Sequence, residues 1–211
     1  KAIKCDLTES KEIENLFLEI ISTYGGLDIL VLNAGIALQG EMSNLDSEVL
    51  RKSFELNFFS QQAIIKEALS IFKRQDLNYT DNTFLLGGQL LFNISKQTLN
   101  PGKGFGAYGI SKSALLALMK QYAIEEGPHS IRSNGVNADR IRSGLLTKEM
   151  ITERSNARGL DESEYMKGNL LKKEVEAKDV ADAFVSLSLM KKTTGAIITV
   201  DGGNTLSLIH I

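Results

Sequence analysis

The sequence contains one cysteine and two histidines among its 211 residues. Cys5 can form neither an internal disulfide nor a cysteine-based metal cluster, so the chain fits a reducing compartment and we expect a cytoplasmic location. His129 and His210 do not supply the ligand cluster that a metal site requires, and both are expected in solvated loop or tail positions. We therefore expect no metal site. Cys5 is expected to be a buried residue on a strand.

Long apolar runs and an excess of positive charge are also lacking. The apolar stretch at residues 27–32 is interrupted by Asp28 and is far shorter than the roughly 20 residues of a membrane-spanning helix. The 24 Lys and Arg residues are interspersed with 26 Asp and Glu residues, which gives a net charge of -2 and no basic stripe for a phosphate backbone. We expect neither a membrane nor a nucleic acid as a partner.

Helical and strand-like patterns alternate along the chain. Apolar residues recur at helical spacing in residues 11–24, and the next stretch, 28–32, is almost continuously apolar, as in strands covered by helices on both faces. This alternation predicts a single domain of the α/β class with a doubly wound parallel sheet. We expect strands at 2–5, 28–32, 90–94, 131–136 and 196–200, and helices at 11–24, 46–73, 108–126, 145–150 and 177–189. Residues 155–168 are the least regular stretch, either a substrate lid or a plain surface loop.

Polar residues and a glycine follow two predicted strands at their carboxyl ends, where open parallel sheets bind ligands. Asn33, Ala34 and Gly35 come directly after the first apolar strand, and Gly35 would let a dinucleotide approach the backbone closely. Asn and Gly are also ordinary turn residues. Ser95 follows the strand at 90–94, where its hydroxyl can hydrogen-bond a substrate oxygen and help to polarise a carbonyl.

Tyr108 and Lys112 stand four residues apart at the start of a predicted helix, so their side chains lie one turn apart on the same face. A phenol has a pKa near 10, and a nearby ammonium can lower it by about 1 to 3 units. Tyr108 could then act as an acid near neutral pH. Such a pair also arises by chance in ordinary helices, but Ser95, thirteen residues before Tyr108, favours a catalytic site.

The Asn-Ala-Gly turn, Ser95 and the Tyr108-x-x-x-Lys112 pair, in this order, resemble the classical short-chain dehydrogenase/reductases over nearly the whole chain. The resemblance implies a Rossmann-like fold and an oxidoreductase that uses NAD or NADP. A hydride would pass between the nicotinamide ring and a small-molecule alcohol or carbonyl substrate. Ser95, Tyr108 and Lys112 would be catalytic: Tyr108 would transfer the proton, and Lys112 would also bind the nicotinamide ribose.

Further positions match the same family. Asn57 matches its fourth catalytic residue, which holds a water in a proton relay to the lysine. Asp6, with Leu7 beside it, matches the acidic residue that contacts the adenine ring. Ile141 and Ser143 occupy positions that usually contact the nicotinamide carboxamide. The resemblance therefore implies a cofactor site made of Asp6, Leu7, Asn33, Ala34, Gly35, Tyr108, Lys112, Ile141 and Ser143.

The chain departs from the family at its start. The glycine-rich turn that places the pyrophosphate at a helix N-terminus is absent, because the chain opens on Lys1 in what resembles the third strand. We expect a truncated N-terminus, weak cofactor binding, and no residue here that selects between NAD and NADP. Residues 1–204 are expected to form the family's domain without its first βαβ unit, and residues 205–211 a tail outside the family.

A second departure follows the strand at 131–136, where residues 137–143 replace the family's usual Pro-Gly turn. With the residues after Ser95, this stretch resembles the dehydrogenase part of bacterial proteins that join a class II aldolase to this domain. The resemblance implies a fused aldolase in the parent protein and a sugar-derived or short hydroxy-aldehyde substrate. In the alternative interpretation, Arg140 and Arg142 pair with nearby carboxylates at a surface turn.

Two functions follow from the sequence. The first is the oxidoreductase, indicated by Asn57, Ser95, Tyr108 and Lys112 together. The second is a catalytically inactive nucleotide-sensing or scaffold protein of the same fold. Such a protein would have no physical need for all four residues. A homo-oligomer is also expected, because helices corresponding to 46–73 and 108–126 commonly form the subunit interface in this family.

Overall fold

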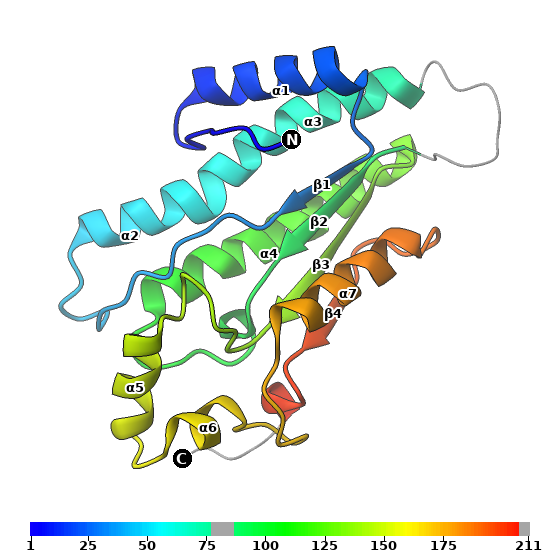
Figure 1. Cartoon of the computed structure of the whole chain (residues 1–211). Helices are drawn as coiled ribbons and strands as arrows, with labels where there is room; N and C mark the ends of the chain where they lie inside the picture. The colour runs from blue at the N-terminus through cyan, green and yellow to red at the C-terminus, as the bar shows by residue number, and fades with distance from the viewer. Residues whose placement is uncertain (77–86, 207–211) are drawn as a thin grey trace.

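The computed structural model describes residues 1–76 and 87–206, which form a parallel sheet with strand order β1-β2-β3-β4 and helices on both faces (Figure 1). The helices and strands are, in chain order, α1 (Ser10–Tyr24), β1 (Ile29–Leu32), α2 (Ser47–Phe54), α3 (Ser60–Asp76), β2 (Gln89–Asn93), α4 (Gly106–Glu126), β3 (Arg132–Ala138), α5 (Lys148–Asn156), α6 (Glu162–Met166), α7 (Ala177–Leu189) and β4 (Ile197–Val200).

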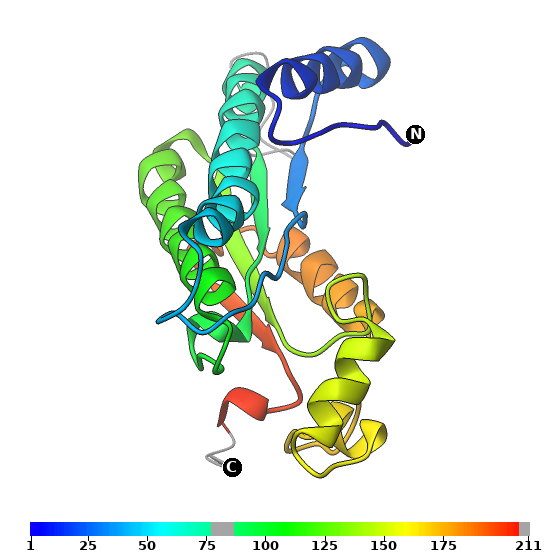
Figure 2. The ribbon, with the colours of Figure 1, turned by 90° about the vertical axis from the view of Figure 1, so that its left-hand side faces the viewer.

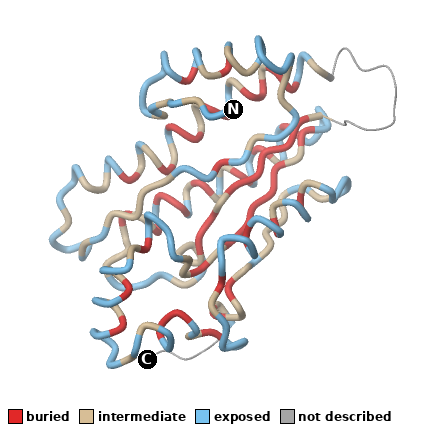
Figure 3. Tube along the Cα trace, viewed as in Figure 1, coloured by how far each residue is buried: buried red, intermediate tan, exposed pale blue. Residues whose placement is uncertain are grey.

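The sheet lies between two helical layers. Helices α1, α3 and α4 cover one face and α7 covers the other (Figure 2). The alternation of side chains along β2 explains both layers: Leu90 and Phe92 belong to the apolar cluster with α1, α3 and α4, whereas Leu91 belongs to the cluster with α7. All three side chains are fully buried, as the red stretch along the sheet in Figure 3 shows. The predicted α/β fold with a parallel sheet is confirmed.

Two expectations for the first strands are wrong. Residues 2–5 form no strand, and Cys5 is half-buried in a loop, because no described strand lies alongside to exchange backbone hydrogen bonds with this segment. Strand β1 is not covered on both faces either. Ile29 and Val31 are exposed, since β1 lies at the edge of the described sheet and α7 packs on the other strands.

The predicted helix at 46–73 is interrupted. Helix α2 passes into a π-helical turn, Glu55–Phe59, before α3 begins. Such turns place one extra residue in the helix and often mark functional sites. Asn57 lies in this turn and is fully buried, so the interruption positions one of the predicted catalytic residues.

The stretch predicted to be irregular is more ordered than expected. Residues 155–168 include the end of α5 and the whole of α6, which begins at a capping box formed by Asp161 and Glu164. Helix α5 starts at Lys148, later than the helix predicted at 145–150, because the Thr147 side chain caps it.

The structure also bears on the predictions for the two histidines, for a metal site and for a membrane-spanning helix. His129 lies in an exposed 3-10 turn, as expected, whereas His210 and residues 207–211 of the predicted tail lie outside the described residues. Among the residues with described coordinates, no group of His, Cys, Asp or Glu is arranged to hold a metal ion. Over the same residues, no helix is both long and apolar enough to cross a bilayer.

Candidate active site

Ser95 lies just beyond the carboxyl end of β2. It is 6% exposed, and its hydroxyl accepts a 3.3 Å hydrogen bond from the Gln97 backbone N–H at the start of a 3-10 turn. The same side chain hydrogen-bonds the Tyr108 hydroxyl, an interaction that lowers the pKa of Tyr108. The fold therefore brings Ser95 and Tyr108 together, as the sequence predicted.

Lys112 is almost completely buried one turn after Tyr108 in α4. Its ammonium lies 6.0 Å from the centre of the Tyr108 ring and donates a 2.8 Å hydrogen bond to the backbone carbonyl of Asn93. Burial without a carboxylate partner lowers the pKa of Lys112 to about 8. At neutral pH the side chain is still mainly cationic, and α4 and β2 together hold this charge beside the phenol.

The expected effect of Lys112 on the acidity of Tyr108 is wrong. Burial raises the pKa of Tyr108 above its ordinary value, and the Ser95 hydrogen bond offsets only part of this rise. The ammonium donates its hydrogen bond to the Asn93 carbonyl, and the net shift in the pKa of Tyr108 is upward. Tyr108 is consequently protonated at neutral pH, a state suited to donating a proton.

Asn57 joins the site to the turn after β1. Its side-chain oxygen accepts a 2.8 Å hydrogen bond from the Ile36 N–H, and its Nδ2 donates 2.9 Å to the Ile36 carbonyl. The same nitrogen lies 3.0 Å from the Ser111 hydroxyl, which in turn donates 2.9 Å to the Tyr108 carbonyl. Hydrogen bonds to protein atoms thus occupy the side-chain amide of Asn57. Ser53, 3.2 Å from Nδ2, completes the group.

Ser53 and Ser111 belong to this group although no sequence motif indicated them. Both are fully buried and lie 3.1 Å apart between α2 and α4. The positions of Ser53 and Asn57, four residues apart, would have placed them on one helical face. The contact with Ser111 joins segments more than 50 residues apart, and no local pattern carries that signal.

The Asn-Ala-Gly turn lies at the carboxyl end of β1, beside these residues. The Asn33 side-chain oxygen accepts a 2.7 Å hydrogen bond from Asn93 Nδ2. A Cβ atom added to Gly35 would lie 2.9 Å from Asn57 Oδ1 and 3.6 Å from Lys112 Nζ. A side chain at position 35 would therefore crowd the buried amide and enter the space beside the ammonium.

Asp6, Leu7, Ala34 and Gly35 line one open, shallow pocket together with Lys4, Cys5 and Leu56. The Asp6 carboxylate accepts hydrogen bonds from the backbone N–H and hydroxyl of Thr8, which lower the pKa of this exposed carboxyl. The structure therefore places four of the predicted cofactor-binding residues at one surface, next to Lys112.

Ile141 and Ser143 lie in the segment after β3. Ile141 is half-buried against the apolar cluster under α7, and the exposed Ser143 side chain accepts a 3.2 Å hydrogen bond from the Leu145 N–H. They lie at the same end of the sheet as Tyr108 but in a separate segment, which follows β3.

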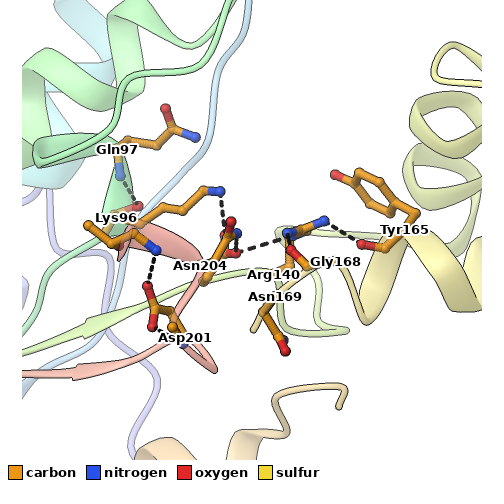
Figure 4. A network of polar contacts seen from close by, with 12 residues as sticks. Lys96, Gln97, Arg140, Tyr165, Gly168, Asn169, Asp201 and Asn204 are labelled. Carbon is orange, nitrogen blue, oxygen red and sulfur yellow. Dashed lines mark hydrogen bonds and ion pairs between the residues drawn. The ribbon is translucent and has the colours of Figure 1, made fainter. Parts of the chain in front are cut away.

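The two arginines of this segment both pair with carboxylates. Arg140 Nε lies 3.1 Å from Asp139, and Arg142 Nε lies 2.6 Å from Glu174. The pairing alternative considered for the sequence is thus confirmed, but Arg140 is not a surface residue. Its side chain is 17% exposed and joins the network in Figure 4.

Comparisons with known proteins identify relatives of this chain. Residues 1–205 match the family model described as enoyl-(acyl carrier protein) reductase. The chain is 31% identical over 217 residues to the uncharacterized oxidoreductase YuxG of Bacillus subtilis, with 96% of this chain and 29% of that protein aligned. It is 30% identical over 208 residues to short-chain dehydrogenase reductase 3a of Arabidopsis thaliana, covering 95% of this chain and 74% of the relative. The chain thus spans under a third of the length of YuxG.

Solved structures share the fold. A short chain dehydrogenase family protein from Francisella tularensis superposes with a TM-score of 0.79 at 28% identity, covering 97% of this chain and 81% of that one. The 3-ketoacyl-(acyl-carrier-protein) reductase from Brucella melitensis has a TM-score of 0.82 at 21% identity, covering 97% and 78%, which shows a common fold only. With a family model matching nearly its whole length, this chain belongs to the short-chain dehydrogenase/reductase family.

Proposed function

We propose that the protein is an oxidoreductase that uses NAD or NADP to interconvert an alcohol and a carbonyl. The observation that carries this proposal is the convergence of Ser95, Tyr108 and Lys112 at the carboxyl end of β2, with Asn57 and Gly35 beside them. A hydroxyl, a protonated phenol and a buried cation are the groups needed to bind and protonate a carbonyl oxygen.

The residues present fit a nicotinamide dinucleotide. The open pocket at Asp6, Leu7, Ala34 and Gly35 suits an adenosine moiety, and Lys112, close to the Gly35 backbone, would hold a ribose. When bound, the nicotinamide ring supplies the hydride chemistry. Asn33 extends this surface along the end of β1.

The segment after β3 would hold the other end of the cofactor. We assign Ile141 and Ser143 to the nicotinamide carboxamide, because they follow the carboxyl end of β3. In the sheet, β3 is separated from β1 by β2 alone. NAD and NADP remain equal candidates here. No described residue of this site singles out the 2′-phosphate.

The side chains have distinct tasks in the reaction. The Ser95 hydroxyl hydrogen-bonds the substrate oxygen, and Tyr108 donates its proton to that oxygen during reduction or takes it during oxidation. Because burial raises the pKa of Tyr108, its phenolate needs a nearby positive charge, which Lys112 provides while it remains protonated. Reduction is thus expected to decline as Lys112 loses its proton above about pH 8.

Asn57 acts on this site by holding the backbone at Ile36 in place. Both hydrogens of its amide are directed at protein acceptors, and its oxygen holds the Ile36 N–H. We therefore assign Asn57 the role of fixing the turn at Gly35 relative to α4. The water relay implied by family resemblance stays a prediction.

The substrate is proposed to be sugar-derived or a short hydroxy-aldehyde, on the resemblance of residues 137–143 to aldolase-linked dehydrogenases. The alignment to 29% of YuxG is compatible with a further domain in that relative, and the fused aldolase stays a prediction for this chain. An intracellular, cytoplasmic location is likewise proposed only from the cysteine content.

A homo-oligomer is also proposed. The π-helical turn and α4 expose large apolar side chains, among them Phe59, Ile110 and Ile124, which is 71% exposed. Exposed apolar groups on these helices favour burial against a second copy. Light scattering on the purified protein tests this proposal, and a monomer at micromolar concentration would contradict it.

The activity is tested by following nucleotide absorbance with NAD, NADP and their reduced forms against a panel of sugars, polyols and hydroxy-aldehydes. Turnover should be lost in Ser95→Ala and retained in Ser113→Ala, a control at an exposed serine of α4. Nucleotide binding without turnover on any substrate of the panel would favour the nucleotide-sensing or scaffold function instead.

A further inference from the structure

Helices α5 and α6 form a small unit with an apolar cluster of its own. Its buried members are Leu146, Ile151, Tyr165 and Met166. This cluster is separate from the two that cover the faces of the sheet. Four buried side chains give a limited core, so the position of the unit relative to the sheet depends on other contacts.

Arg140 supplies such contacts from the end of β3. Its Nη2 donates a 2.6 Å hydrogen bond to the Gly168 carbonyl, and Nη1 donates to the Tyr165 carbonyl. The guanidinium also lies 5.0 Å from the centre of the Tyr165 ring. Figure 4 shows the side chain reaching from the strand end toward α6. The planar fork thus binds α6 through the Tyr165 carbonyl and ring face, and the segment just after α6 through the Gly168 carbonyl.

Asp139 holds Arg140 in this orientation. Its Oδ2 accepts from Arg140 Nε at 3.1 Å and from the Asn204 amide, while Oδ1 lies 3.3 Å from Lys96 Nζ. The Asp139 side chain is only 7% exposed. One buried carboxylate therefore joins the segments that follow β2, β3 and β4.

Lys96 connects this network to the candidate active site, because it directly follows Ser95. Burial lowers the pKa of Lys96, and Asp139 acts in the opposite direction by stabilising its charged form. A buried cation at this place needs the carboxylate. The two cations around Asp139 are therefore both coupled to the same acidic side chain.

The other end of the unit contacts the helix of Tyr108. The Arg154 guanidinium of α5 lies 4.7 Å from the centre of the Phe105 ring, and Phe105 is the N-cap residue of α4, three residues before Tyr108. A shift of α5 and α6 would therefore change the surroundings of Tyr108. This contact makes the placement of the unit relevant to substrate binding.

We infer that Arg140 is a positioning residue: held by Asp139, it fixes α5 and α6 against the strand ends and thereby shapes the substrate side of the candidate active site. The inference rests on the proposed function for its effect on substrate binding. The placement of α5 and α6 itself can be measured without any turnover.

The test compares hydrogen exchange of the backbone amides in wild type, Arg140→Lys and Arg142→Lys. Lysine keeps the charge at 140 but cannot span two carbonyls. Exchange at residues 148–168 should accelerate roughly tenfold in Arg140→Lys, while the amides of α3, α4 and the sheet keep their wild-type rates. Arg142→Lys is the matched control, because its hydrogen bonds go to Glu174 and not to α6. Wild-type exchange in Arg140→Lys would overturn the inference.

A second variant keeps the test decisive. Asp139→Asn has nearly the same shape but removes the charge between Lys96 and Arg140, so it should accelerate exchange in the same residues. With a turned-over substrate, Arg140→Lys should raise KM about tenfold and change kcat less than twofold, with nucleotide affinity unchanged. A loss in kcat alone would contradict a positioning role. Failure to find any substrate would count against the proposed function, while the exchange result would still decide the placement of α5 and α6.

Discussion

The Lys112 ammonium donates a 2.8 Å hydrogen bond to the backbone carbonyl of Asn93, two residues before Ser95. Helix α4 and strand β2 are thereby joined at the point where the candidate catalytic groups meet. The contact fixes the cation at the strand end and leaves the Tyr108 hydroxyl to interact with Ser95. The hydroxyl that follows β2 is thus brought together with the phenol and the ammonium of α4.

Lys112 should give the protein a distinctive dependence of stability on pH. Its pKa is about 8 in the folded protein and near the ordinary 10.5 in the unfolded chain. Between these values the unfolded chain holds more protons, so the free energy of unfolding should rise with pH, by up to about 3 kcal/mol from this group. Below pH 8 both states are protonated and the contribution is constant.

Urea denaturation of wild type and Lys112→Met from pH 7 to pH 10 measures this effect. The difference between their free energies of unfolding should change across the window from pH 8 to 10, because only the wild type gains stability from the lysine. Other titrating groups cancel in the difference. Parallel curves would show that burial does not shift this amine.

Asn57→Ala should destabilise the protein by about 2 to 4 kcal/mol, because it leaves both the N–H and the carbonyl of Ile36 without their partner. The exposed Asn156→Ala provides the control and should change stability by less than about 0.5 kcal/mol. Thermal or urea unfolding compares the two variants. Equal stability of Asn57→Ala and wild type would contradict the assigned role of this side chain.

Gly35→Ala should weaken nucleotide binding. The new methyl would lie 2.9 Å from Asn57 Oδ1 and would fill part of the space beside Lys112. We expect the Kd for NADH or NADPH to rise roughly tenfold and stability to fall by about 1 to 3 kcal/mol. The control is Gly127→Ala, where an added Cβ meets no atom within 4 Å. Nucleotide fluorescence titration gives the Kd, and an unchanged value for Gly35→Ala would show that the cofactor binds elsewhere.

The sequence predicted the parts of the site that depend on local spacing. Tyr108 and Lys112 lie one helical turn apart, and Ser95 and the Asn-Ala-Gly turn follow parallel strands, so their positions come from helix geometry and from the common direction of these strands. The α/β fold was predictable for the same reason. Residues 2–5 could not be placed correctly, because an extended segment becomes a strand only with a neighbour to pair with.

Local sequence patterns could not predict the features that depend on contacts between residues far apart in the chain. The π-helical turn at Asn57 accompanies hydrogen bonds to Ile36 and Ser111, 21 and 54 residues away. The shift in the pKa of Tyr108 was predicted in the wrong direction, because burial outweighs the hydrogen bond with Ser95. The link from Arg140 to α6 spans 25 residues, and its acceptors are backbone carbonyls, which every residue carries.

The central claim, that Tyr108 exchanges a proton with the substrate in a nicotinamide-dependent reaction, is tested most directly by comparing turnover in Tyr108→Phe and Tyr122→Phe. Both tyrosines lie on α4, and Tyr122 is buried away from Ser95 and Lys112 in the main apolar cluster. We predict that Tyr108→Phe lowers kcat by about 100-fold or more and that Tyr122→Phe keeps wild-type turnover. Wild-type kcat in Tyr108→Phe would contradict it.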